Sequence, residues 1–237
     1  MKAVILCGGR GTRLHPYTMT IPKPLLPLGE TPILEIVLRQ LSEAGFTEAI
    51  LALGHMSSFF TSYLDAEQDK WDISLRYHFE KVPMGTAGAL SQIEDLPDNF
   101  VVMNADVLTT LSFRKLMNDH IEKRAKASLT IKRRQVDIDF GVIKSSDDSR
   151  LLGYDEKPSI PYDVSIGVNV LNKDALSYIP KGEYFDMPSL MMALVEDGQI
   201  VNCHRSDDFW LDIGRAEDFH LASEEFAANP DRFFIQC

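Results

Sequence analysis

A glycine-rich segment that carries several cations lies near the start of the chain. It runs from residue 6 to residue 28 and reads LCGGRGTRLHPYTMTIPKPLLPL. Because glycine has no Cβ, the backbone N–H groups of such a segment are open to a bound anion. Arg13 adds a guanidinium fork that matches phosphate oxygens, and Lys23 adds a mobile positive charge. We therefore predict a nucleotide-binding loop that holds phosphates. Its predicted contacts are Leu6, Gly8, Gly9, Gly11, Thr12, Arg13 and Lys23.

Two well-known phosphate loops do not match this segment. A Rossmann dinucleotide loop reads GxGxxG, but Leu14 stands where counting from Gly9 puts the third glycine. A Walker A loop needs Lys followed by Ser or Thr after its last glycine, and the segment has no such pair. A plain strand-to-helix turn would explain the glycines, but it would leave Arg13 and Lys23 without a role.

Two aspartates stand where strands are predicted to end. Asp106 follows the apolar run VVMN, and Asp212 stands in FWLDIGR just before a predicted helix. In α/β proteins ligands bind outside the carboxyl ends of the strands, so both carboxylates are candidate site residues. An isolated aspartate at such a point is also a common helix cap or turn residue, and the spacing alone leaves that alternative open.

The segments that would position these side chains alternate between strand and helix. Strands are predicted at 3–7, 49–53, 75–79 and 100–103, and helices at 31–45 and 57–67. Farther along, helices are predicted at 112–123 and 216–227, and strands at 127–132, 140–144 and 164–171. This alternation predicts an α/β fold with a mostly parallel, doubly wound sheet. We expect one continuous domain over residues 1–237, whose first half (1–110) is the nucleotide-binding half.

Composition and charge exclude several classes of protein. The 237 residues are 45% hydrophobic and 25% charged, which is ordinary for a folded globular chain. The net charge of −11 argues against nucleic-acid binding, although residues 1–29 hold four basic residues and no acidic one. Three cysteines are too few for a disulfide framework, and no apolar run is long enough for a bilayer. We expect a cytoplasmic protein without a signal peptide, a membrane partner or a nucleic-acid partner.

The string GGRGTRLHPYTMTIPKPLLPL resembles the signature GGxGTRLxPxTxxxPKPxxPL of the sugar-1-phosphate nucleotidylyltransferases. The resemblance implies a Rossmann-like, GT-A-like three-layer sandwich and transfer of a nucleotide from an NTP to a sugar 1-phosphate. The blocks VMNAD and WLDIG resemble the family's VxNxD and WxDIG, in which two carboxylates hold one Mg²⁺ ion. By this resemblance Asp106 and Asp212 are the metal ligands, and Asn104 is a nucleotide contact. The implied catalytic residues are Arg13, Lys23, Asp106 and Asp212.

Further blocks of the family imply the contacts to the second substrate. YDEKP resembles the EKP block, in which Glu156 would contact sugar hydroxyls and Lys157 the sugar phosphate. Gly141 in DFGVI resembles a glycine whose backbone meets the sugar. Ser165 departs from the family's NxGIY, because it stands where that pattern has Asn, and this departure bears on which sugar is bound. Residues 111–237 would thus form the sugar-phosphate-binding half.

The loop EKVPMGTAGAL, residues 80–90, bears on the choice of nucleotide. Gly85 and Thr86 would bring backbone groups close to a base or ribose, although Thr86 also suits a helix cap. By resemblance, PxGTAGA is typical of guanylyltransferases that act on mannose-1-phosphate-like sugars. We therefore expect GTP as the nucleotide and a mannose- or heptose-like sugar 1-phosphate as the second substrate.

Three alternatives stay open at the level of the sequence. The same chemistry with UTP, dTTP or CTP and another sugar 1-phosphate would need a similar phosphate loop. A metal-dependent glycosyltransferase of related fold would also use a strand-end aspartate, but it typically has a DxD pair, and the first position here is Asn104. The chain could also be a nucleotide-sensing subunit without catalytic activity. The family resemblance further allows a homodimer.

Overall fold

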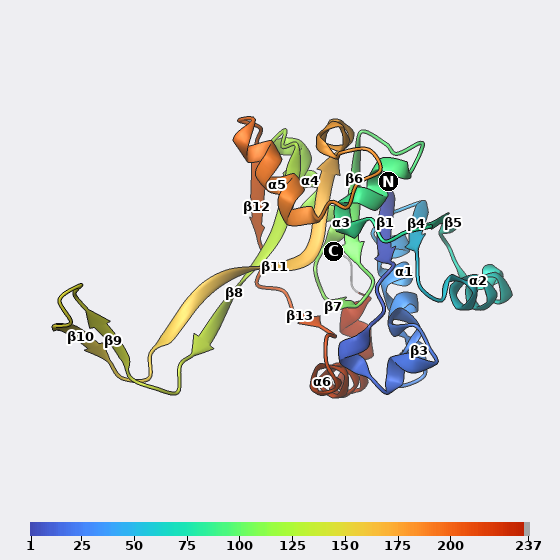
Figure 1. The fold of residues 1–237 in the computed structure, drawn as a ribbon. Helices are drawn as coiled ribbons and strands as arrows, with labels where there is room; N and C mark the ends of the chain where they lie inside the picture. Colours follow the sequence, from blue (N-terminus) through green and yellow to red (C-terminus); the bar gives the residue numbers. More distant parts are fainter. Residues whose placement is uncertain (235–237) are drawn as a thin grey trace.

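A seven-stranded sheet forms the centre of the computed structural model, which describes residues 1–234 (Figure 1). The strands lie in the order β12-β8-β11-β6-β1-β4-β5. Their bounds are Lys2–Cys7 (β1), Glu48–Leu53 (β4), Ser74–Phe79 (β5), Asn99–Asn104 (β6), Ala127–Asp137 (β8), Ser159–Asn172 (β11) and Val201–Arg205 (β12). Strand β11 is antiparallel to both of its neighbours, and the other pairings in this sheet are parallel. The predicted mostly parallel sheet is confirmed.

Helices cover both faces of this sheet. Their bounds are Ile33–Glu43 (α1), Ser57–Ala66 (α2), Gly85–Gly88 (α3), Phe113–Glu122 (α4), Met187–Glu196 (α5) and Ala216–Ala228 (α6). Successive side chains of a strand point to opposite faces. Accordingly, Ile5 of β1 packs in the cluster formed with α1, α2 and α4, whereas Val4 packs with α3 and α5. The result is the predicted three-layer sandwich.

Short elements beside the sheet carry the predicted phosphate loop and Asp212. The loop folds into 3₁₀ helices at Thr12–Leu14, Tyr17–Met19 and Lys23–Leu25. A hairpin follows, in which β2 (Pro27–Leu28) pairs with β3 (Thr31–Pro32), and this region shares an apolar cluster with α6. Farther along, β13 (Trp210–Asp212) pairs with β7 (Val107–Thr109) and sets Asp212 opposite Val107. This pairing brings two segments about a hundred residues apart to the same edge of the sheet.

Some predicted boundaries differ from the structure. The helix predicted at 31–45 begins only at Ile33, because the residue before a proline favours extended backbone and Pro32 itself is extended at ψ 145°. The strands predicted at 127–132 and 164–171 are parts of longer ones, β8 and β11. Helix α5 and strand β12 were not predicted, since MPSLMMALVE is apolar on most positions and VNCHR is short and has only two apolar residues.

The outer parts of β8 and β11 leave the body of the molecule as a two-stranded ribbon. The ladder between them continues without a break out to the pair Asp137–Ser159. Beyond it, β9 (Val142–Ser145) and β10 (Leu151–Asp155) form a hairpin. Figure 1 shows this ribbon projecting away from the sheet and its helices. We call residues 135–162 the arm.

Candidate active site

The predicted phosphate loop follows β1 and lines a cavity of about 210 Å³. The backbone after β4 approaches this loop closely at Gly54, since a Cβ on Gly54 would lie 3.0 Å from the Cα of Gly8. Gly11 has a left-handed backbone at φ 63°, and its carbonyl accepts a hydrogen bond from Thr18 Oγ1 at 2.8 Å. Of the predicted site residues, this cavity is lined by Leu6, Gly9, Gly11, Thr12, Arg13, Lys23 and Asp106.

A nearly buried ion pair joins the phosphate loop to the end of β6. Lys23 Nζ lies 2.5 Å from Asp106 Oδ2, and only 9% of the Lys23 side chain is exposed. Because β6 pairs directly with β1, the sheet brings together residues that are 83 positions apart. The other carboxylate oxygen of Asp106, Oδ1, is buried and has no hydrogen-bond partner among the described residues. A buried acceptor left unpaired is uncommon, and a bound ion or water is one physical explanation for it.

Asp212 completes the group of four predicted catalytic residues. Burial raises the pKa of Asp212, and the neighbouring carboxylate of Asp106 raises it further, whereas Lys23 and Arg13 lower it. Gly214 lies between two of these side chains: a Cβ there would be 3.2 Å from Asp212 Oδ2 and 3.5 Å from Arg13 Nη1. The structure therefore brings Arg13, Lys23, Asp106 and Asp212 to one place.

The two carboxylates suit a magnesium ion. Mg²⁺ is usually held by one or two carboxylates together with substrate phosphates and water. Asp106 offers a buried oxygen without a partner, and Asp212 lies close enough for the two negative charges to oppose each other. Within residues 1–234 no cluster of three or more His, Cys, Asp or Glu forms a complete protein cage. The donor set thus fits an ion whose remaining ligands come from phosphate and water.

A second cavity, of about 560 Å³, opens beside the first. Of the predicted site residues, this cavity is lined by Leu6, Thr86, Asn104, Ser165 and Asp212. Strand β11 changes register between Ser165 and Asn169, with Gly167 at φ 75°, and such bulges are common next to active sites. Asn169, which is 6% exposed, lines the same cavity, and its Oδ1 is buried without a hydrogen-bond partner. Sequence reasoning missed Asn169, because nothing in VNVLN singles it out from other strand residues.

The loop with Gly85 and Thr86 has a clear structural role. Gly85 has φ 80°, and a Cβ on it would lie 2.5 Å from the carbonyl oxygen of Phe185. Thr86 Oγ1 accepts a hydrogen bond from the backbone N–H of Met187 at 2.7 Å, at the first residue of α5. Thr86 therefore caps a helix other than its own and also lines the second cavity. Gly85 lines neither cavity, and its contact with a nucleotide stays a prediction.

Glu80 is a site candidate that the sequence analysis did not single out. Its carboxylate lies beside the phosphate loop, since a Cβ on Gly8 would come within 2.9 Å of Glu80 Oε1. The backbone N–H of Met84 donates to Glu80 Oε2 at 3.3 Å, which holds the side chain in place. Burial raises the pKa of Glu80. A partly buried carboxylate oxygen is thus aimed at the loop that carries the phosphate site.

The predicted sugar-phosphate contacts are divided between the second cavity and the arm. Ser165 lines the cavity, whereas Gly141, Glu156 and Lys157 lie in the arm and line neither cavity. The ladder of β8 and β11 is unbroken from Ser165 out to Ser159, six residues farther along an extended strand. At a rise of about 3.3 Å per residue, this places the start of β11 roughly 20 Å from Ser165. Within one copy, Lys157 is therefore far from the second cavity, which Ser165 lines.

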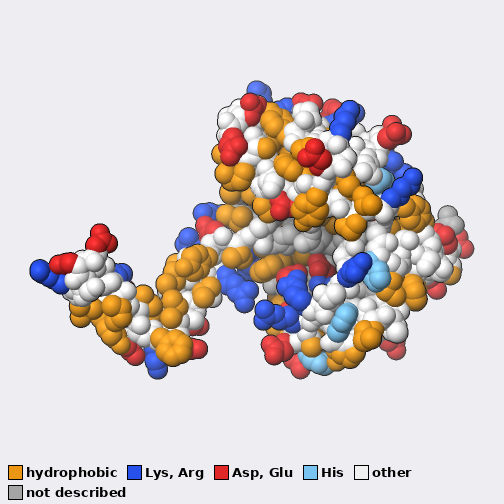
Figure 2. Space-filling model, viewed as in Figure 1, with side chains coloured by type: hydrophobic (Ala, Val, Ile, Leu, Met, Phe, Trp, Pro, Cys, Tyr) orange, Lys and Arg blue, Asp and Glu red, His pale blue; other side chains and the backbone are white. Residues whose placement is uncertain are grey.

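A basic groove runs from the phosphate loop to the base of the arm. It has a volume of about 530 Å³, and its cationic residues are Arg13, Lys132, Arg133, Arg134 and Arg215. Its acidic lining residues are Asp212 and Asp218. Figure 2 shows Lys and Arg side chains gathered where the arm leaves the body. The site region is therefore cationic, although the whole chain carries a net charge of −11.

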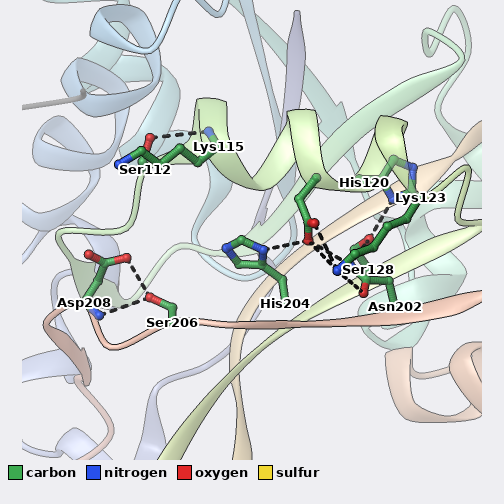
Figure 3. Close-up of polar contacts among 10 residues, drawn as sticks. Ser112, Lys115, His120, Lys123, Ser128, Asn202, His204, Ser206 and Asp208 are labelled. Carbon is green, nitrogen blue, oxygen red and sulfur yellow. Dashed lines mark hydrogen bonds and ion pairs between the residues drawn. The ribbon is translucent and has the colours of Figure 1, made fainter.

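The remaining titratable clusters belong to the scaffold. Figure 3 shows His204 and Asn202 of β12 beside α4, where both donate to the carboxylate of Asp119 at 2.8 and 3.0 Å. Burial would raise the pKa of Asp119, but these hydrogen bonds and Lys123 hold it at about 2. The neighbouring His120 is fully buried, and burial lowers its pKa to about 4. Burial also raises the pKa of the Cys7 thiol, so this thiol stays protonated and is not a nucleophile.

Comparison with known proteins agrees with this geometry. A family model described as nucleotidyl transferase matches residues 2–229. A UTP–glucose-1-phosphate uridylyltransferase of Synechocystis sp. is 30% identical over 242 residues, covering 94% of this chain and 62% of that protein. The catalytic subunit beta of mannose-1-phosphate guanylyltransferase from Danio rerio is 31% identical over 226 residues, covering 92% and 62%. The chain thus spans less than two thirds of the length of these relatives.

Structural comparison shows a shared fold. The crystal structure of HddC from Yersinia pseudotuberculosis has a TM-score of 0.71, with 24% identity over 95% of this chain and 99% of that one. At this identity the likeness concerns the fold alone. In the described part of the chain, no helix has the length and apolar character needed to cross a membrane.

Proposed function

Because the chain belongs to the nucleotidyl transferase family, we propose that it joins a nucleoside triphosphate to a sugar 1-phosphate. The products are pyrophosphate and a nucleoside-diphosphate sugar. The family membership predicted from the loop sequence is thereby confirmed. The observation that carries the proposal is the Lys23–Asp106 pair, whose two residues both line the cavity of the glycine loop and whose carboxylate keeps one buried oxygen without a partner among the described residues.

The proposed chemistry needs charge neutralisation rather than a general base. A phosphate monoester has a second pKa of about 6, so the attacking sugar 1-phosphate is largely a dianion at neutral pH. The difficulty is the approach of this dianion to the α-phosphorus of another polyanion. A site for this reaction must therefore hold both substrates in line and neutralise their charges.

The cations of the site have separate roles in this proposal. Lys23, held beside the cavity by Asp106, stabilises the charge at the α-phosphate. Arg13 and the backbone N–H groups of the glycine loop bind the β- and γ-phosphates. Arg134 and Arg215 extend this cationic surface along the groove, where the departing pyrophosphate would leave. Asp106 and Asp212 would hold Mg²⁺, which when bound neutralises phosphate oxygens of the nucleotide.

Glu80 supports GTP as the nucleotide. A guanine base presents an N–H and an NH₂ on one edge, and both can donate to a single carboxylate. Uracil and thymine present one N–H between two carbonyl oxygens, which a carboxylate would repel. Glu80, fixed by Met84 beside Gly8, offers such an acceptor next to the phosphate loop. Together with PMGTAGA, it favours guanylyl transfer to a mannose- or heptose-like sugar 1-phosphate.

The test is release of pyrophosphate from each common NTP in the presence of Mg²⁺ and a panel of hexose and heptose 1-phosphates. We expect release only when both substrates are present, with the highest kcat/KM for GTP. Release from UTP with glucose 1-phosphate would instead assign the activity of the Synechocystis relative. Release of the nucleoside diphosphate from an added sugar nucleotide, without pyrophosphate chemistry, would support a glycosyltransferase.

Arg13 provides the matched residue test. Arg13 is exposed, and its side chain forms no ion pair with the described residues. Arg13→Ala should therefore leave folding intact. We expect kcat to fall about a hundredfold, as for removal of one preorganised charge contact. Arg10→Ala, in the same loop but outside the lining of the cavity, is the control and should keep near-normal turnover. Equal activity of the two variants would remove Arg13 from the mechanism.

A further inference from the structure

The arm exposes a large apolar surface. Its large hydrophobic side chains are strongly exposed: Val136 43%, Phe140 77%, Ile143 53%, Leu151 67%, Leu152 70%, Tyr154 58% and Tyr162 52%. Figure 2 shows hydrophobic side chains along the length of the arm. With 150–250 Å² for an aromatic side chain and somewhat less for an aliphatic one, these residues expose roughly 800 Å². Summed over both faces of the ribbon, this area is comparable with the roughly 800 Å² that one partner contributes to a standard protein interface.

The arm has no support from its own chain over most of its length. Beyond the pair Lys132–Val164 it consists of two strands, first of β8 and β11 and then of β9 and β10. An isolated two-stranded ribbon is marginally stable in water and usually needs a further surface to pack against. A partner that covers the exposed apolar side chains would provide that surface.

The charges of the arm and of the site are complementary. Residues 135–162 contain six acidic and three basic residues, for a net charge of −3. The groove beside the phosphate loop contains five cationic and two acidic residues, for a net charge of +3. Within one copy, the outer arm projects away from the sheet and its helices (Figure 1). The groove of a second copy would offer the opposite charge to the arm.

Lys157 has two features that indicate a binding role. On the arm, Lys144 pairs with Asp155 and Arg150 pairs with Asp148, but Lys157 forms no ion pair with the described residues. Lys157 also has a left-handed backbone, at φ 42°, which is unfavourable for a residue other than glycine. Strain of this kind clusters at ligand-binding positions. A free cation in a strained turn is thus held roughly 20 Å beyond Ser165, along an extended strand.

We propose that two copies of the chain exchange their arms. Each arm packs against the partner copy and brings Lys157 to the partner's second cavity, which is lined by Ser165. The inference rests on the proposed function and on the contact that the EKP block implies, between Lys157 and the phosphate of the sugar 1-phosphate. A two-fold symmetric pair satisfies both contacts at once, because each copy gives an arm and receives one. Each complete site then combines the phosphate loop of one copy with Lys157 and Glu156 of the other.

Sedimentation velocity tests the exchange without any assay of activity. We expect the full chain to sediment as a dimer and Leu152→Asp/Tyr154→Asp to sediment as a monomer, because each aspartate would place a charge in the interface. Both positions are more than half exposed, so the variant should fold. Ile121→Asp, on the exposed face of α4 at 52% exposure, is the matched control and should remain dimeric. A monomeric wild-type chain, or a dimer unaffected by the arm variant, would overturn the proposal.

Complementation between two inactive variants tests whether Lys157 acts on the partner's site. Arg13→Ala and Lys157→Ala are co-produced with different tags, and the mixed dimer is isolated through both tags. One of its two sites then has an intact loop and receives an intact arm, so we expect about half of the wild-type activity per dimer. The mixed dimer of Arg13→Ala and Lys23→Ala has no intact loop and should stay inactive.

The outcomes separate the two proposals. No recovery in the Arg13→Ala/Lys157→Ala dimer, with an active wild type, would show that Lys157 does not act across the dimer and would overturn the inference. An inactive wild type would instead refute the proposed function. Sedimentation would then still decide the exchange of arms by itself, through the dependence of the dimer on Leu152 and Tyr154.

Discussion

The pairing of Lys23 with Asp106 predicts that variants of the two residues differ in how they change the free energy of unfolding and the activity. Asp106→Asn removes the negative charge beside an ammonium group that is 91% buried, since only 9% of the Lys23 side chain is exposed. Removing one partner of a buried pair typically costs about 3–5 kcal/mol of the free energy of unfolding. Here we expect about 2 kcal/mol, because the Asp106 side chain is 23% exposed and an Asn oxygen can still accept from Lys23. For a chain of this length, that corresponds to a fall in Tm of roughly 4–8 °C.

The double variant Lys23→Met/Asp106→Asn isolates the pair. It removes both charges, so we expect it to regain most of the stability lost in Asp106→Asn while staying inactive. Chemical denaturation of the wild type, both single variants and the double variant gives the coupling energy of the pair. Purely additive changes, within about 0.5 kcal/mol, would refute the reasoning, because independent sites add in that way.

The same variants report on the metal without an activity assay. Asp106 Oδ1 is the buried oxygen without a partner, and an Asn side chain is a weaker ligand for Mg²⁺ than a carboxylate. In the presence of GTP, Mg²⁺ should raise the Tm of the wild type by several degrees more than that of Asp106→Asn. An equal Mg²⁺-dependent shift in both proteins would exclude Asp106 as a ligand of the ion.

Three further predictions concern other parts of the molecule. Glu80→Gln should lower the ratio of kcat/KM for GTP over UTP about tenfold or more, because the amide no longer offers two acceptor oxygens to guanine; an unchanged ratio would argue against Glu80 as the base contact. Acidification from pH 6.5 to pH 4 should lower the free energy of unfolding by on the order of 3 kcal/mol, since His120 takes up its proton at about pH 6.5 when unfolded but only at about pH 4 when folded. In His120→Gln, this part of the pH dependence of denaturant unfolding should be missing, and a profile identical to that of the wild type would rule out His120. Gly85→Ala should lower Tm more than Gly182→Ala. Both glycines have positive φ, at 80° and 75°, but only at Gly85 would the Cβ meet a neighbour, the Phe185 carbonyl oxygen at 2.5 Å. We expect the two variants to differ by about 2 kcal/mol in the free energy of unfolding, and equal Tm values would show that the contact is relieved elsewhere.

Much of the site could be predicted from the sequence, because its signals are local. The glycines, Arg13 and Lys23 lie within a single segment of 23 residues, and their types already indicate phosphate. The apolar strand before Asp106 was recognisable, and ligands in α/β proteins lie at strand ends. Asp212 was found through the block WLDIG, which resembles the family's WxDIG. The mostly parallel sheet was predicted from the local alternation of strand and helix patterns, and it is confirmed. The three-layer sandwich, which the family resemblance implied, is confirmed as well.

Contacts between distant segments were decided by the tertiary structure. The Lys23–Asp106 pair exists because β6 lies next to β1, and Asp212 joins it because β13 pairs with β7. Glu80 and Asn169 carry no local signal, and only the close approach of Gly8 and the bulge in β11 place them near the site. Strand pairing over long sequence separations depends on the packing of the whole chain, which no short pattern encodes.

The position of Lys157 shows this division most clearly. Its block, EKP, was readable in the sequence together with its predicted partner, the phosphate of a sugar. Only the structure reveals that β8 and β11 continue straight out of the body and hold this block in an exposed arm. Residue types determine what a side chain can bind, because that depends on its own charge and hydrogen-bonding groups. Where the side chain is delivered depends on the direction of the strands that carry it, and that direction is a property of the folded sheet.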